Sequence, residues 1–140
     1  MVSLCYYGEM KLQVGVKILI RNSEGQYLLI QRSEPLPDGT GIKWDIPGGR
    51  IGTSERLEEA LNREVQEEIG IKLDNPVRLL KAQDIVLPDI ELHVVRLTYM
   101  SEFQHVATLS SEHQNYKWVT QDEALVMDVD PYLHEVLDSL

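Results

Sequence analysis

The sequence predicts an α/β fold in which a mixed β-sheet is packed between helices. Segments with the alternating pattern of strands lie on both sides of one well-bounded helix, and two further helical segments end the chain. This order of elements is typical of a sheet covered by helices. With 140 residues and 43% hydrophobic content, the chain can build one core of ordinary size. We therefore expect a single domain that spans residues 1–140.

The first part of the chain predicts a β-hairpin. From Lys11 onwards, hydrophobic residues recur with a period of two, which is the period of a strand. The recurring residues are Val14, Val16, Ile18 and Ile20. Residues 21–25 have turn chemistry, and residues 26–31 read as a second strand, so the two strands should pair. Two prolines and two glycines in residues 33–41 then indicate an irregular loop.

A helix is predicted from Ser54 to Ile69. At its start, Thr53 and Ser54 can accept hydrogen bonds from the first free N–H groups, and Glu55 complements the positive end of the helix dipole. At its end, Gly70 can adopt the left-handed conformation that closes the last turn. Both ends of the helix are thus marked in the sequence.

The inward face of this helix changes from apolar to acidic along its length. Its apolar part consists of Leu57, Ala60 and Leu61. At 100° per residue, the same stripe continues to Glu64 and Glu68, with Glu67 on its flank. An acidic helix face is usually solvated, but carboxylates on the core side are costly unless a cation neutralises them. A cluster of oxygen ligands suits Mg²⁺ or Mn²⁺, whereas zinc more often has His or Cys ligands.

The second half of the chain predicts two long strands, a shorter strand and two closing helices. The long strands are expected over residues 77–87 and 90–103, with a tight turn at Pro88-Asp89. Residues 106–111 are expected to form a loop or a short strand. The other elements are a strand over 115–120 and helices over 121–127 and 131–140. Asp130 precedes a proline and is the expected N-cap of the last helix.

Composition and charge narrow the classes of partner. A net charge of −10 argues against binding to duplex nucleic acid or to an anionic membrane surface, since both need a basic footprint. Cys5 is the only cysteine, so no internal disulfide can form. No apolar run reaches membrane-spanning length, and the N-terminus lacks a signal-peptide pattern, so we expect a cytoplasmic protein. The sequence does not decide the oligomeric state, and a homodimer is possible.

The helix and the loop before it resemble the signature box of the Nudix hydrolases. Gly49 is followed after five residues by Glu55, and Glu55 is followed after seven by Arg63-Glu64-Val65-Gln66-Glu67-Glu68-Ile69-Gly70-Ile71. Such a spacing of fixed residues is very improbable by chance. Three other segments also resemble the family, namely residues 28–32, 44–49 and 112–118. One departure is Ser54, where the family often has glycine.

The resemblance implies an α/β/α sandwich and a Mg²⁺- or Mn²⁺-dependent hydrolase. Its substrate would be a small-molecule nucleotide in which a nucleoside diphosphate is linked to a further group. Glu64 and Glu68 are then the first choice as metal ligands, and Glu67 shares metal binding or proton abstraction. The family also implies the Gly48 carbonyl as a ligand. Arg63, four residues before Glu67 and next to Glu64, can orient a carboxylate through a charge-assisted fork.

The other candidate site residues each have more than one possible role. Glu64, Glu67 and Glu112 are candidates for the general base, which differs between family members. Arg32 and Lys43 can meet phosphate oxygens, but a salt bridge to a local carboxylate explains each equally well. Trp44 can stack on a base or pack beneath the loop. Glu55 is expected to support the loop or a water molecule near the metal.

The sequence favours, without deciding, one substrate class. The short chain resembles the MutT-like group, which cleaves nucleoside triphosphates to monophosphate and pyrophosphate. Pro47-Gly48-Gly49 counts against dinucleoside polyphosphates, whereas residues 112–118 resemble a segment of enzymes that cleave them. Pro88 weakly suggests ADP-ribose or nucleotide sugars, although a turn explains it as well. A non-catalytic regulatory module is the alternative of another class, but such a module would be expected to lose a glutamate of the box.

Overall fold

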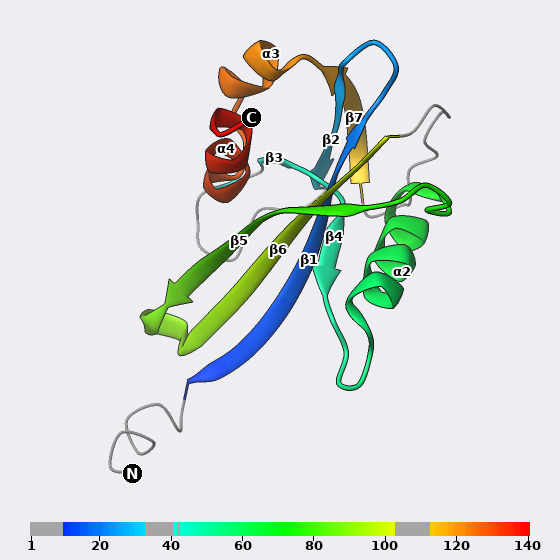
Figure 1. Ribbon diagram of the computed structural model, residues 1–140. Coiled ribbons are helices and arrows are strands. Elements are labelled where there is room, and N and C mark those ends of the chain that lie inside the picture. Colours follow the sequence, from blue (N-terminus) through cyan, green and yellow to red (C-terminus); the bar gives the residue numbers. More distant parts are fainter. Residues whose placement is uncertain (1–9, 33–40, 42, 103–112) are drawn as a thin grey trace.

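The computed structural model describes residues 10–32, 41, 43–102 and 113–140. In chain order its elements are β1 (Lys11–Arg21), β2 (Tyr27–Arg32), β3 (Trp44–Asp45), β4 (Gly48–Arg50), α2 (Leu57–Ile69), β5 (Arg78–Leu87), the 3₁₀ turn η1 (Pro88–Ile90), β6 (Leu92–Glu102), β7 (His113–Val119), α3 (Gln121–Leu125) and α4 (Pro131–Asp138). The expected order of strands, helix, strands and helices is confirmed (Figure 1).

Within the described residues, seven strands form one mixed sheet. Its main path is β3-β2-β1-β6-β5, with β4 paired to β1 and β7 paired to β2. β1 and β6 are parallel along their whole length, and the other pairs of named strands are antiparallel. The predicted hairpin of β1 and β2 is present, with Arg21 opposite Tyr27. Most of β2, however, pairs with β7, which the sequence pattern did not reveal.

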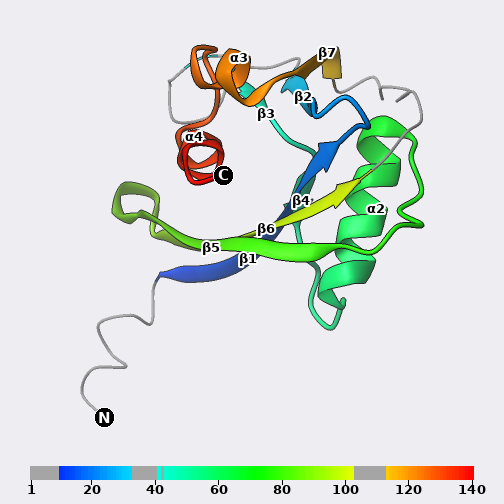
Figure 2. The same cartoon turned by 45° about the horizontal axis from the view of Figure 1, so that its top comes forward.

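The sheet lies between helices, as predicted. Helix α2 covers one face, and α3 and α4 lie on the other side (Figures 1 and 2). Each side has its own cluster of buried hydrophobic residues. On the α2 side, Val16, Ile18 and Ile20 of β1 pack with the apolar residues of α2. On the other side, Leu19 packs with residues of α3 and α4, including Leu133. Strand β1 is therefore buried on both faces.

Helix α2 begins later than predicted. The prediction that Thr53 and Ser54 cap it was wrong, because Ser54 has a positive φ of 66° and the helix starts at Leu57. Its N-cap is Arg56, whose side chain makes no capping hydrogen bond. Leu57 is also 37% exposed instead of facing the core. The buried stripe consists of Ala60, Leu61, Val65, Glu68 and Ile69.

The other element ends agree closely with expectation. Gly70 has a φ of 68° and closes α2 through its N–H bond to the Gln66 carbonyl. The Asp130 carboxylate accepts from the N–H groups of Tyr132 and Leu133, which confirms the predicted cap of α4. Residues 106–111 lie outside the described residues. In the described part of the chain, no helix is long and apolar enough to cross a membrane.

Candidate active site

Arg63 is the centre of a network that joins α2 to the loop before it. Its Nε and Nη2 donate to Glu55 Oε2 and Oε1 at 2.7 and 3.0 Å, in a bidentate pair. Its Nη1 donates to Glu64 Oε1 at 2.9 Å and, more weakly, to Glu67 Oε2 at 3.5 Å. Nη2 also reaches the Arg50 carbonyl at 3.2 Å. The predicted contacts of Arg63 with Glu64 and Glu67 are therefore present, and Glu55 is its strongest partner.

Glu55 stabilises the loop from its outer side. Its Oε1 accepts the N–H of Gly52 at 2.8 Å, while both carboxylate oxygens face Arg63. The hydrogen bonds from Arg63 and from Gly52 hold the pKa of Glu55 down at about 2. Glu55 thus stays ionised at neutral pH as an acceptor for Arg63 and the loop, as the sequence suggested.

Glu64 lies in a space that only glycine at position 49 leaves open. The side chain of Glu64 is 16% exposed, and a Cβ atom added to Gly49 would lie 2.6 to 2.7 Å from its carboxyl group. Gly49 is part of β4, which pairs with β1. The second glycine of Pro47-Gly48-Gly49 therefore lets the end of a strand approach the helix carboxylate.

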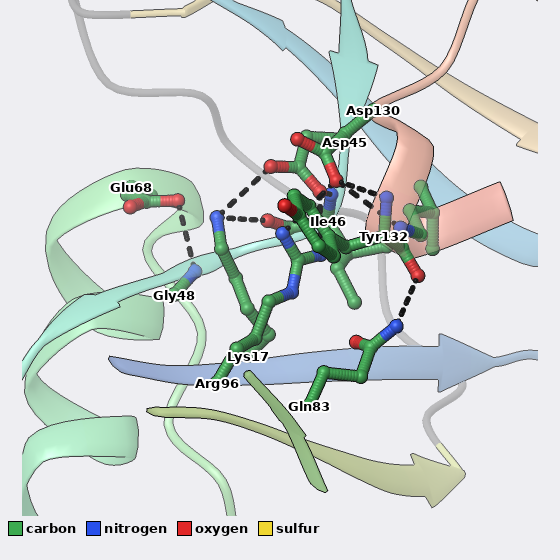
Figure 3. A network of polar contacts seen from close by, with 10 residues as sticks. Lys17, Asp45, Ile46, Gly48, Glu68, Gln83, Arg96, Asp130 and Tyr132 are labelled. Atoms are coloured by element: carbon green, nitrogen blue, oxygen red, sulfur yellow. Dashed lines mark hydrogen bonds and ion pairs between the residues drawn. The ribbon is translucent and has the colours of Figure 1, made fainter. Parts of the chain in front are cut away.

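Glu68 is the buried carboxyl group of the helix. It is 9% exposed, and its Oε2 accepts the N–H of Gly48 at 3.3 Å (Figure 3). Burial raises the pKa of Glu68 from 4.5 to about 8, although Lys17 and the Gly48 N–H both lower it. The neighbouring carboxylates of Glu64 and Asp45 add to the rise. A cation beside Glu68 would favour its ionised form.

The carboxylates of Glu64, Glu67 and Glu68 suit a divalent cation, although their oxygen atoms do not converge on one point. Glu64, Glu68 and the more exposed Glu67 offer oxygen ligands only, and the glycines at 48 and 49 keep the approach clear of side chains. In the part of the chain that the structure describes, no three His, Cys, Asp or Glu side chains converge as a metal site. Arg63 holds Glu64, and Gly48 holds Glu68, so binding a cation would require these side chains to turn.

A second polar cluster lies on the other face of the sheet (Figure 3). Lys17 Nζ donates to Asp45 Oδ2 at 3.1 Å and to the Ile46 carbonyl at 3.2 Å. Arg96, which is 5% exposed, donates to Asp45 Oδ1 and to Asp130 Oδ1, each at 3.1 Å. Asp130 also caps α4, so this cluster ties β1, β3 and β6 to the last helix.

The two cations determine the ionisation of Asp45. Burial alone raises the pKa of its carboxyl group, but the charges of Lys17 and Arg96 outweigh burial and lower it to about 2. Next to them, Gln83 Nε2 donates to the Tyr132 carbonyl at 3.0 Å. Among the described residues, three buried polar atoms of this region lack a hydrogen-bond partner, namely Gln83 Oε1, Arg96 Nε and Thr98 Oγ1.

The remaining predicted site residues lie apart from the acidic helix or outside the described atoms. Lys43 Nζ pairs with Asp128 at 2.8 Å, which is the salt-bridge alternative. Trp44 packs against the hydrophobic cluster beside α3 and α4, with Lys117 Nζ 5.9 Å from its ring centre. Arg32 ends β2, but its side chain is outside the described atoms, as is all of Glu112.

The sequence reasoning missed Lys17, Asp45 and Arg96. A signal for two of them was present. Lys17 interrupts a run of strand residues that are fully buried, and Arg96 interrupts the strand residues 92–101. A charged residue inside a buried strand is rare unless it is paired. What the sequence did not reveal is that the partners come from β3 and from the cap of α4.

The mixed sheet, its covering helices and the glutamates held by Arg63 together define the Nudix class of α/β proteins. A family model described as the NUDIX domain matches residues 11–140. The chain belongs to the Nudix family and is a Nudix-type hydrolase. Members of this family generally use a divalent metal ion.

Relatives and solved structures agree with this assignment. The nucleoside triphosphatase NudI of Salmonella agona (strain SL483) is 29% identical over 124 residues, which cover 79% of this chain and 84% of that relative. The crystal structure of a MutT protein from Methanosarcina mazei Go1 has a TM-score of 0.81 and 32% identity, and the match covers 94% of both chains. The solution structure of the E. coli ORF135 protein has a TM-score of 0.76 and 26% identity, with 94% of this chain and 89% of that one covered.

Proposed function

We propose that this protein is a Mg²⁺-dependent pyrophosphohydrolase that cleaves a nucleoside triphosphate to the monophosphate and pyrophosphate. The observation that carries the proposal is the set of helix carboxylates that Arg63 and the Gly48 N–H hold beside a glycine-lined strand end. The names of two relatives support the substrate class, since one is a nucleoside triphosphatase and another a MutT protein.

Glu64, Glu67 and Glu68 would hold the divalent cation, together with the Gly48 carbonyl. When bound, Mg²⁺ or Mn²⁺ would neutralise phosphate oxygens and acidify a water molecule. Without a cation, the negative charge of these glutamates would repel an anionic substrate. The net charge of −10 strengthens this requirement for a cation.

The chain's own residues would position the reacting groups. Arg63 fixes Glu64 by a hydrogen bond of 2.9 Å and is itself fixed by the bidentate pair with Glu55. Arg63 would restrict the orientations open to Glu64 and so leave a smaller rearrangement when the cation binds. Glu64 and Glu67 remain candidates for the general base. Glu112 also remains one, although it lies outside the described residues.

The test is a substrate panel with product masses recorded. It contains nucleoside triphosphates, ADP-ribose, nucleotide sugars and diadenosine polyphosphates, each with Mg²⁺, with Mn²⁺ and with EDTA. We expect a triphosphate to give monophosphate and pyrophosphate with either metal, and no turnover in EDTA. Preference for ADP-ribose, a nucleotide sugar or a dinucleoside polyphosphate would move the substrate to those classes. Nucleotide binding without any turnover would favour the non-catalytic regulatory module.

A further inference from the structure

Lys17 is a cation in the middle of a buried strand. Its neighbours in β1, Val16 and Ile18, are both fully buried, and the side chain of Lys17 itself is only 21% exposed. Placing an ammonium group at such a position costs free energy of desolvation. Val16 and Ile18 point toward α2, so strand alternation turns Lys17 to the opposite face of the sheet. The position of Lys17 therefore requires compensation by charges nearby.

The contacts of Lys17 place its ammonium group on Asp45 and its stem against Gly48, the glycine that also bonds Glu68. Gly48 is its partner across the β1 and β4 ladder, and a Cβ at Gly48 would lie 2.8 Å from Lys17 Cδ, so the lysine stem runs past this glycine. The ammonium group bonds Asp45 and the Ile46 carbonyl. The N–H of the same Gly48 donates to Glu68, so this glycine connects the lysine stem with the buried carboxyl group (Figure 3).

The charge of Lys17 also acts on Glu68. The lysine stem runs past Gly48, whose N–H donates to Glu68 at 3.3 Å, and in keeping with this arrangement the charge of Lys17 lowers the pKa of Glu68. Arg96 also donates to Asp45 at 3.1 Å, so Lys17 is not the only cation that compensates Asp45. Lys17 thus supplies positive charge to the carboxyl group of the acidic helix that is most buried.

We propose that Lys17 is a built-in counter-cation of Glu68, which stabilises the protein without metal and lowers the affinity of the carboxylate site for a divalent cation. The second half of this proposal rests on the proposed function, since it requires Glu68 to be part of that site. A fixed ammonium group attracts the carboxylate and repels the incoming cation. The same residue therefore lowers the free energy of the empty site and raises that of the loaded one.

The first experiment tests the pairing of Lys17 with Glu68 and involves no metal. Unfolding free energies are measured in EDTA and mildly alkaline buffer for the parent, Lys17→Gln, Glu68→Gln and the double variant. Glutamine at position 17 is uncharged and one bond shorter than lysine, and the contacts with Asp45 and the Ile46 carbonyl that it loses cancel in the cycle because both backgrounds lose them. We expect Lys17→Gln to destabilise the parent clearly more than it destabilises Glu68→Gln. Equal losses in the two backgrounds would overturn the counter-cation role.

The second experiment measures the affinity for Mn²⁺ itself, by electron paramagnetic resonance of the free ion, without substrate. We expect Lys17→Gln to bind Mn²⁺ about tenfold more tightly than the parent, as the loss of one nearby repelling charge implies. Lys17→Arg keeps the charge and should bind Mn²⁺ like the parent. Lys81→Gln is the matched control, because Lys81 pairs with Glu135 on β5 and α4, away from the acidic helix.

The outcomes separate this inference from the proposed function. Unchanged or weaker Mn²⁺ binding by Lys17→Gln, while the parent binds normally, would overturn the effect on affinity and leave the proposed function intact. If the parent shows no saturable Mn²⁺ binding, the metal-dependent function fails, and with it the effect on affinity. The double-mutant cycle in EDTA would still decide whether Lys17 is the counter-cation of Glu68. If Lys17→Gln does not fold, Lys17→Met is the replacement.

Discussion

The protonation of Glu68 makes the stability of the metal-free protein depend on pH. Burial raises the pKa of its carboxyl group from 4.5 to about 8, so the folded chain binds this proton more tightly than the unfolded chain. The contribution of Glu68 to stability is therefore fully present below pH 4.5 and is lost as pH rises through about 8. In EDTA we expect a loss on the order of 3–5 kcal/mol across this range.

The measurement is the free energy of unfolding against pH in EDTA, for the parent and for Glu68→Gln. The variant has no proton to lose, so its curve should lack this fall and it should be at least as stable as the parent at alkaline pH. Asp45 acts in the opposite sense, because its lowered pKa gives stability that is lost only as pH falls toward about 2. Parallel curves for the two proteins between pH 4.5 and 8 would contradict the burial of Glu68 as the cause.

Glu68→Gln should also affect catalysis far more than a change elsewhere on α2. Under the proposed function, the variant loses one of the charged oxygen ligands of the cation, and we expect kcat to fall by at least about 10²-fold. Glu59→Gln is the matched control, since Glu59 is exposed on the same helix. A fall of less than tenfold for Glu68→Gln would make it a neighbour of the site and not a ligand.

At the scale of elements, Gly48 and Gly49 of β4 have different tasks, which alanine substitutions should separate. Gly48 has a φ of 146°, and an added Cβ would lie 2.0 Å from the Val16 carbonyl oxygen of β1. Gly48→Ala should therefore weaken the pairing of β1 and β4 and cost more than about 1 kcal/mol of stability. At Gly49 the three atoms nearest to the added Cβ all belong to the flexible end of Glu64.

Gly49→Ala should accordingly keep most of the stability of the parent and lose activity, because it displaces the Glu64 carboxylate. Urea unfolding and kcat/KM for the same preparations measure both effects. Gly52→Ala is the control, since its added Cβ would make contacts of 3.6 Å or longer and its φ is not in the left-handed region. Equal stability of Gly48→Ala and Gly52→Ala would contradict the close approach of β4 to β1.

The fork of Arg63 connects α2 to its preceding loop, and lysine cannot reproduce it. The guanidinium group serves Glu55, Glu64, Glu67 and the Arg50 carbonyl at once, whereas an ammonium group is a point charge without the planar fork. Under the proposed function, we expect Arg63→Lys to lower kcat/KM by about 10- to 100-fold, as misplacement of a positioned group does. Arg56→Lys, at the N-cap seven residues earlier, should have little effect on the same assay.

Sequence periodicity predicted the middle and the end of α2 better than its start. The stripe that runs into Glu64 and Glu68, and the closing role of Gly70, depend on local geometry and spacing alone. The start depends on the loop, where the hydrogen bond from Gly52 to Glu55 and the positive φ of Ser54 remove the first expected turn. The bidentate pair between Arg63 and Glu55 also holds this loop, and helix-capping preferences do not include such a contact.

At the scale of the whole molecule, Arg96 joins strands from both halves of the chain to the last helix. Arg96→Met would leave Asp130 without this buried cation and Asp45 with Lys17 as its remaining partner, and we expect it to cost about 3–5 kcal/mol of stability. Lys81→Met, which breaks the partly exposed pair with Glu135, should cost at most about 1 kcal/mol. Thermal and urea unfolding of both variants give the comparison. Similar losses would show that the buried cluster adds no more than a surface pair.

The buried cluster also shows where sequence reasoning must stop. The acidic helix could be predicted because its residues are neighbours in one signature. Lys17, Asp45, Arg96 and Asp130 come from four separate elements, and only the folded sheet brings them together. Asp130 was predicted as a cap, but its second role toward Arg96 depends on where α4 docks. Hydropathy does identify Lys17 and Arg96 as unusual charges within hydrophobic strands, but it does not predict which residues pair with them.

The parallel pairing of β1 with β6 has a consequence for how the chain folds. Lys11 lies opposite Leu92 and Arg21 opposite Glu102, so the central pair joins segments more than half the chain apart. Closing so long a loop is entropically costly, whereas β5 and β6 are linked by a short turn and can pair early. During synthesis, β1 must therefore wait for most of the protein to emerge before its partner exists. Until then, the backbone edge of β1 that pairs with β6 stays open to chaperones and to aggregation.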